Sequence, residues 1–225
     1  MIILFLCVVM PRLFLIGIYQ IAHSETKDPV LYEIPKELQI KKIDSNNRII
    51  HYDNIEFTSP YHKLVSTKNS STGIAYVFDD GHKIMINKMK IDTYDVQANL
   101  TLKQQKYLHN ILGDENSKSS FELMKKIYML TPDDLSYFAS LNKITLKKEL
   151  LAFKRIFIPC QDSDSLYCFD TNYIKGFQYG DPQNSKIIII QIFIENKNCT
   201  LSLVGDNINQ NDIDSILSTI NITNK

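Results

Sequence analysis

The residues best suited to chemistry are two aspartates and a histidine in one short stretch, Asp79-Asp80-Gly81-His82. A carboxylate beside an imidazole is a pairing that general-base catalysis uses, because the carboxylate orients the ring and stabilises its protonated form. The same stretch lies between two apolar runs, and Asp-Gly in that position predicts a tight β-hairpin turn. We interpret the stretch as a turn and keep Asp79, Asp80 and His82 as a candidate polar cluster.

No other catalytic, cofactor or metal motif occurs in the sequence. It has no Gly-rich phosphate loop, no dinucleotide fingerprint, no nucleophile elbow, no H-E-x-x-H and no C-x-x-C. The histidines at positions 23, 51, 62, 82 and 109 include no pair spaced to share a helix face. We therefore assign no catalytic residue, no cofactor-binding residue and no metal ligand, and we expect no cofactor.

The charge balance argues against a nucleic-acid partner. Lys plus Arg number 25, as do Asp plus Glu, whereas phosphate binding requires a basic excess on some face. The densest basic run, Lys147, Lys148, Lys154 and Arg155, lies opposite the apolar face of a predicted helix. We interpret this run as a solvated helix face, with an anionic partner such as membrane headgroups as the alternative.

The first 22 residues predict a membrane location. Their only charged side chain is Arg12, and their length is that of a membrane span, about 20 apolar residues. Pro11 and Arg12 interrupt such a span at its midpoint. If the segment is not removed, residues 1–22 contact the membrane.

The second interpretation is a signal peptide that starts at Met10. Arg12 then supplies the basic region, residues 13–21 supply the apolar region, and Ala22-His23-Ser24 supplies small residues before the cleavage site. Cleavage is expected between Ser24 and Glu25. Both interpretations place the remaining chain across a membrane, in a bacterial cell envelope.

The rest of the chain predicts an α+β fold with a mostly antiparallel sheet, a central block of helices and a C-terminal helix, preceded by the N-terminal apolar helix. Strand candidates are residues 38–43, 48–52, 55–57, 74–78, 83–86, 166–169, 174–179, 186–194 and 199–204, and the polar residues 67–73 predict a loop. Helical spacing and capping residues place the helical block at about 101–158, and Asn209 with Asp212 begins the last helix.

These elements predict one domain over residues 25–225, in which strands from both ends of the chain surround the apolar run KIIIIQIFI and the helical block packs on the sheet. A split into two domains at the helical zone is the alternative. On the last helix of the block, Leu146, Leu150, Phe153 and Phe157 form one apolar face.

The C-terminal fifth carries a resemblance. From Lys175 onward, the string KGFQYGDP, the apolar strand, the turn and the helix NQNDIDSILSTI resemble the C-terminal end of small bacterial hypothetical proteins of unknown function. The hairpin followed by a helix is also similar to PsbP-like α+β domains, which are non-catalytic partner-binding modules. This resemblance implies a binding role and assigns no site residue.

The leading hypothesis is an exported or membrane-anchored module that binds an unknown protein partner, as an envelope accessory or immunity-type protein. The alternatives are an envelope hydrolase with a site built from dispersed residues, centred on His82, and a secreted effector. An adjacent toxin gene favours an immunity protein, whereas a pocket with converging His and carboxylates favours the hydrolase.

The cysteines give a testable prediction, a disulfide between Cys160 and Cys168. The intervening loop is polar and turn-prone, which brings the two residues within bonding reach, and Cys199 starts an apolar strand where a thiol suits the core. Closing this loop stabilises the fold by about 2.5 kcal/mol in the chain-entropy model. Mass spectrometry of non-reduced peptides from the native envelope checks it, and thiols at both positions would contradict both the disulfide and the export that it requires.

Overall fold

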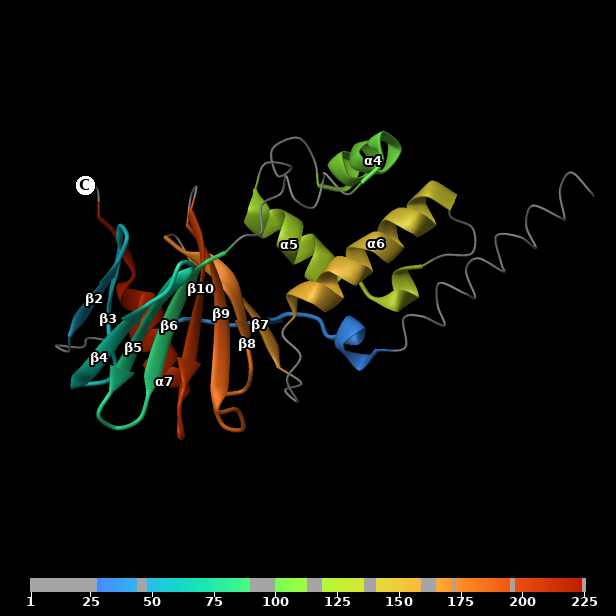
Figure 1. Cartoon of the computed structure of the whole chain (residues 1–225). Coiled ribbons are helices and arrows are strands. Elements are labelled where there is room, and N and C mark those ends of the chain that lie inside the picture. Colours follow the sequence, from blue (N-terminus) through green and yellow to red (C-terminus); the bar gives the residue numbers. More distant parts are fainter. Residues whose placement is uncertain are drawn as a thin grey trace, which may run out of the picture. The chain divides into compact units, whose positions relative to one another are not determined.

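The computed structural model describes residues 28–43, 48–89, 100–112, 119–135, 141–158, 165–171, 173–194 and 197–223. The chain divides into two compact units, each described by itself (Figure 1). The helical unit comprises Met1–Ile34 and Ile91–Pro159, and the sheet unit comprises Pro35–Lys90 and Cys160–Lys225. The N-terminal apolar helix and the cleavage residues Ser24 and Glu25 lie outside the described residues. The packing of the helical block on the sheet stays a prediction.

The α+β class is confirmed, and the sheet unit is built on an eight-stranded sheet in the order β1-β7-β8-β9-β10-β6-β5-β4. All neighbouring strands are antiparallel except the parallel pair β1–β7. The strands are β1 (Lys36–Glu37), β4 (Leu64–Asn69), β5 (Gly73–Phe78), β6 (Lys83–Lys88), β7 (Leu166–Asp170), β8 (Lys175–Tyr179), β9 (Ile187–Ile194) and β10 (Lys197–Val204). Strands from both ends of the chain therefore surround β9, as the sequence predicts.

A small second sheet and one helix complete this unit. The sheet has the order β11-β3-β2, with β2 (Ile49–Tyr52), β3 (Ile55–Thr58) and β11 (Asn221–Ile222). Helix α7 (Gln210–Thr219) begins at Asn209, whose side chain accepts from the Asp212 amide in a capping box. The predicted Asp-Gly hairpin is present between β5 and β6, where Gly81 adopts a φ of 89°.

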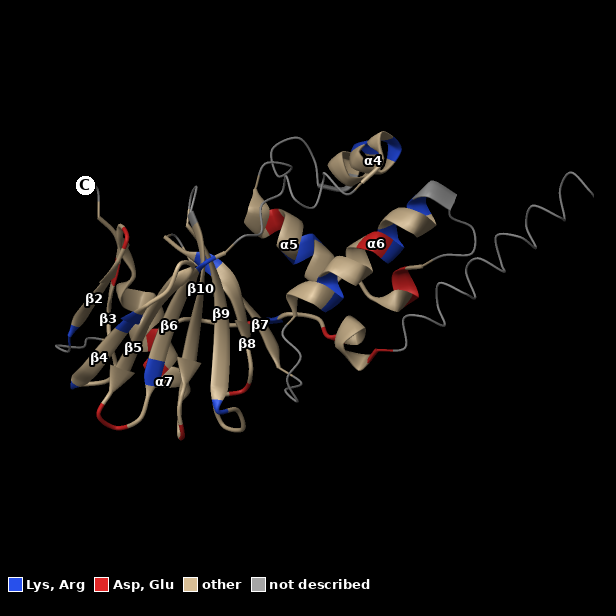
Figure 2. Ribbon diagram, viewed as in Figure 1, with Lys and Arg blue, Asp and Glu red and all other residues tan. Residues whose placement is uncertain are grey.

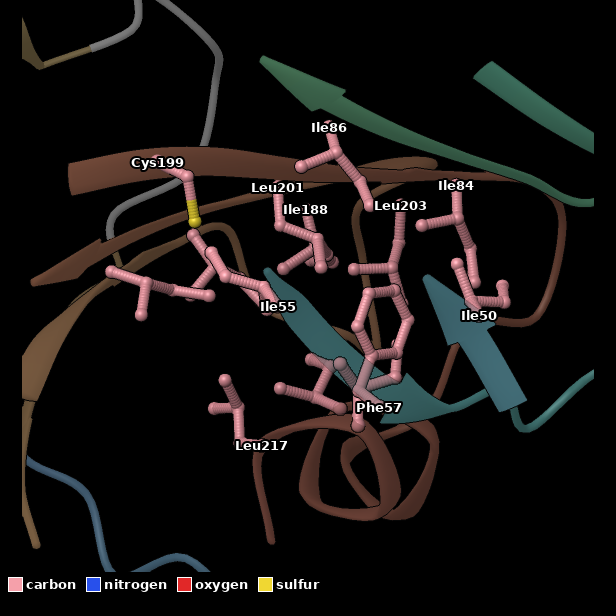
Figure 3. Close-up of a cluster of buried hydrophobic side chains, with 14 of the residues drawn as sticks. Ile50, Ile55, Phe57, Ile84, Ile86, Ile188, Cys199, Leu201, Leu203 and Leu217 are labelled. Atoms are coloured by element: carbon pink, nitrogen blue, oxygen red, sulfur yellow. The ribbon is translucent and has the colours of Figure 1, made fainter. Parts of the chain in front are cut away.

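The core of the sheet unit lies between one face of the large sheet, the small sheet and α7. Successive side chains along a strand point to opposite faces, so alternate residues of β6, β9 and β10 share the face that meets Phe57 of β3 and Leu217 of α7 (Figure 3). Those residues include Ile84, Ile86, Ile188, Leu201 and Leu203, each at most 1% exposed.

Two predictions about local structure are wrong, each for a physical reason. Residues 38–43 alternate like a strand, but the pairing of β1 with β7 ends at the Leu38 amide, which donates to the Cys168 carbonyl (2.8 Å). The amides of Lys41 and Ile43 instead donate to side chains of α7, the Asp214 carboxylate (3.3 Å) and the Ser218 hydroxyl (3.4 Å). The predicted loop 67–73 is also wrong at both ends, because residues 67–69 belong to β4 and Gly73 begins β5, which leaves residues 70–72 as the connection. Strand β4 is polar because most of its side chains are exposed.

The helical unit contains α4 (Leu102–Leu112), α5 (Ser120–Met129), α6 (Leu141–Phe157) and two short 3₁₀ helices, η2 (Pro29–Tyr32) and η4 (Pro132–Asp134). Ser119 caps α5 by accepting from the Glu122 amide, as its sequence predicts. On α6, Leu146 and Leu150 are buried, but Phe153 and Phe157 are half-buried and stack on each other. A second side of α6 is buried through Ile144, Leu151 and Lys154.

Candidate functional site

The structure brings Asp80 and His82 together and adds residues distant in sequence. The His82 Nδ1 lies 3.0 Å from a carboxylate oxygen of Asp80, and its Nε2 lies 2.8 Å from the main-chain carbonyl of Asp206. The Tyr61 ring stacks on the imidazole, with centroids 4.3 Å apart. Asp79 is exposed, and its amide donates to the Lys63 carbonyl.

The histidine ring fills the space between the β5–β6 turn and the connection from β10 to α7. A Cβ at Gly205 would lie 2.3 Å from the His82 Cδ2, so only glycine allows this connection to pass so close to the ring. Figure 2 shows that both segments carry acidic residues at their turns. In the connection, the Asp206 carboxylate pairs with Lys186 at 2.8 Å. This contact lowers the pKa of Asp206.

In this geometry the His82 side chain links the β5–β6 turn to the connection between β10 and α7. The Asp206 carbonyl only accepts hydrogen bonds, so Nε2 must carry a proton to bond with it, and its lone pair is not available as a base. Burial, followed by the charges of Asp212 and Asp80, raises the pKa of the Tyr61 hydroxyl well above its usual value. Neither the imidazole Nε2 nor a Tyr61 phenolate is therefore presented as a base or nucleophile at neutral pH.

A second polar centre, Lys154, was missed by the sequence analysis. This side chain is 0% exposed, so its interpretation as part of a solvated face is wrong. Its Nζ donates to three main-chain carbonyls, those of Leu31 (2.8 Å), Glu33 (2.6 Å) and Leu130 (2.7 Å). An ammonium has three donors, and here all three are used. We call this arrangement the Lys154 clamp.

Two other basic residues of α6 bind the chain at the two 3₁₀ helices, η2 and η4. Arg155 pairs with Asp28, which also caps η2 by accepting from the Val30 amide. Lys147 donates to the main-chain carbonyl of Asp134, the last residue of η4. Three members of the basic run, Lys147, Lys154 and Arg155, therefore fasten segments of the helical unit to α6. No sequence pattern distinguishes this use from a solvated face.

Two thiols of the sheet unit, those of Cys168 and Cys199, lie among the described residues. Cys199 is buried in the core, and burial raises its pKa to about 12, so it is not a nucleophile at neutral pH. Cys168 is half-buried in β7. Cys160 lies outside the described residues, so the disulfide stays a prediction.

The outer side of β4 is the remaining candidate site. Phe78 donates to the His82 carbonyl and Ser70 to the Gly73 carbonyl. These two bonds show which main-chain groups point to which neighbouring strand. The N–H and C=O groups of odd-numbered residues of β5 point toward β4, and those of even-numbered residues of β4 point toward β5. The N–H and C=O of Thr67 and Asn69 therefore point away from the sheet. Among the strands that the structure describes, none pairs with this side of β4.

Two features limit strand pairing on the outer side of β4. The register shifts between Leu64 and Ser66, a bulge that leaves Val65 without a ladder partner and 62% exposed. Lys68 places a charge beside the outward groups. Bulges and lysines are the devices by which edge strands avoid indiscriminate pairing. The regular stretch of β4 beyond the bulge is accordingly short, residues 66–69. Its sequence signal, a β-branched Val65 and Thr67 among polar residues, is weak beside the turn residues that follow.

Within the described ranges, no helix is long and apolar enough to cross a membrane, and no three His, Cys, Asp or Glu side chains group as metal ligands. No protein-family model, curated protein or solved structure matches the chain.

The Lys154 clamp generates a prediction about pH. Burial, opposed by the carboxylates of Glu33 and Asp134, lowers the pKa of Lys154 to about 8 from 10.5. Between these values the unfolded chain binds more protons than the folded one, so the free energy of unfolding rises with pH, by at most about 3 kcal/mol. Urea titrations followed by helical circular dichroism from pH 7 to 10.5 measure this rise.

Two variants isolate the contribution of Lys154 from that of other titrating groups. Lys154→Met should lose the rise, whereas Lys126→Met, at an exposed position of α5, should retain it. An equal rise of the unfolding free energy with pH in the wild type and in Lys154→Met would contradict the prediction. It would mean that the three carbonyls solvate the ammonium as well as water does.

Proposed function

We propose that this chain is a bacterial envelope protein, exported or anchored through its first 24 residues, that binds a protein partner and catalyses no reaction. The observation that carries the proposal is the outward row of main-chain groups on β4. An edge strand with unpaired N–H and C=O groups binds an extended segment by adding it to the sheet as a further strand.

The chemistry of β4 defines the segment that it accepts. Main-chain hydrogen bonds at Thr67 and Asn69 provide the affinity and require an extended partner backbone without proline at the facing positions. Val65, exposed at the bulge, offers an apolar contact at one end of the pairing, and Lys68 favours an acidic side chain. The partner is therefore an extended, proline-free segment with an acidic residue.

The hydrolase alternative receives less support from the geometry. Its proposed centre, His82, directs Nε2 at a main-chain carbonyl, and the neighbouring Tyr61 hydroxyl has a raised pKa. An immunity-type role and a secreted effector both agree with strand addition, since each acts by binding another protein.

The proposal predicts that a proline at one position abolishes binding. In Thr67→Pro the missing N–H is one that points away from β5, so the β4–β5 ladder is retained while the outward donor is lost. Thr67→Val is the matched control, because it changes the side chain and keeps the N–H. A photo-crosslinking amino acid at Val65, in the native host, should yield an envelope-protein adduct in the Thr67→Val background and none in the Thr67→Pro background.

A second crosslinking position tests whether the adduct is specific. Tyr173, in the β7–β8 turn, is 86% exposed and lies away from β4 in the strand order. A crosslinker there should not capture the same protein. An adduct at Val65 that survives Thr67→Pro, or one formed equally at Tyr173, would contradict strand addition at β4.

A further inference from the structure

Three residues with exposed apolar side chains are chain neighbours of the carbonyl acceptors in the Lys154 clamp. Tyr32 is 41% exposed, Ile34 44% and Met129 49%. Each is adjacent in the chain to a residue whose carbonyl accepts from Lys154, namely Leu31, Glu33 or Leu130. Because all three oxygens lie within 2.8 Å of one nitrogen, the main chain converges at these points. We call Tyr32, Ile34 and Met129 the clamp patch.

The clamp patch is tied to the chain that leaves the predicted membrane segment. Asp28 is held on α6 by Arg155, and η2 follows at once. Five residues lie between Ala22 and Asp28, so the six Cα-to-Cα steps that join them reach at most about 20 Å. If residues 1–22 lie in a membrane, the patch is held within that reach of its surface.

The residue types of the patch suit the boundary between headgroups and acyl chains. Tyrosine is enriched at this boundary because its ring is apolar and its hydroxyl is polar. Isoleucine and methionine supply apolar surface that the boundary accepts. Lys126, exposed on α5 one turn before Met129, is placed to reach lipid phosphates.

We propose that the clamp patch rests on the phospholipid interface of the membrane that holds residues 1–22, so that the Lys154 clamp orients the helical unit on the bilayer. This inference depends on the membrane anchoring in the proposed function. The ammonium joins η2, the end of α5 and α6 at one point, so the residues that carry the three apolar side chains are held close together.

The absence of tryptophan from the chain allows a direct test. The full chain is reconstituted in phosphatidylglycerol–phosphatidylcholine vesicles whose acyl chains carry bromine, a contact quencher of tryptophan fluorescence. Tyr32→Trp and Met129→Trp each introduce a single reporter. Leu102→Trp is the control: Leu102 is 84% exposed, and α4 lies on the far side of α6 from η2 (Figure 1).

The expected result is that brominated lipid removes most of the emission of the reporters at positions 32 and 129 and little of that at 102. Reporters at 32 and 129 that emit as strongly as the control, in chains that float with the vesicles, would overturn the inference and leave the anchoring intact. Chains that do not float with the vesicles would overturn the anchoring and this inference together.

Discussion

The pairing of β9 with β10 is the constraint on which the sheet unit depends. Eight consecutive residues of each strand are in register, from Ile187 opposite Val204 to Ile194 opposite Lys197. A slip of one residue would turn Ile188, Ile190 and Ile192 from the core to the opposite face. With this register fixed, β6 pairs along the other side of β10, β5 and β4 follow in turn, and β8 and β7 extend the sheet beyond β9. The position of β4 at the edge is therefore a consequence of the central pair.

The helical unit is organised in part by a buried charge. Residues Leu31, Leu135, Ile144 and Leu151 form a small apolar cluster there. Beside it, the Lys154 ammonium joins η2, the end of α5 and α6 by donating to three main-chain carbonyls. An ammonium at that point satisfies the last carbonyls of two short elements, which is the role that water or a cap has at other helix ends.

How much could be predicted depended on whether a segment is stabilised by its own pattern or by a distant partner. KIIIIQIFI, the Asp-Gly turn and the capping residue Asn209 carry local signals, and the elements that they predict are present. By contrast, β4 forms because β5 offers it a ladder, and residues 38–43 are held by α7 side chains about 175 positions away. Lys154 is the clearest failure, since its carbonyl partners carry no side-chain signature. The Asp80–His82 pair was predictable, but the carbonyl that occupies Nε2 belongs to Asp206, 124 residues away.

The central claim is that β4 presents an outward row of main-chain hydrogen-bonding groups to a partner. Residue-resolved amide hydrogen exchange on the isolated protein tests it most directly, because exchange reports whether each N–H is bonded. The account predicts fast exchange at Thr67 and Asn69 and protection at Lys68, whose N–H faces β5. Protection at Thr67 equal to that at Lys68 would mean that the outer side of β4 is already paired, and would contradict the account.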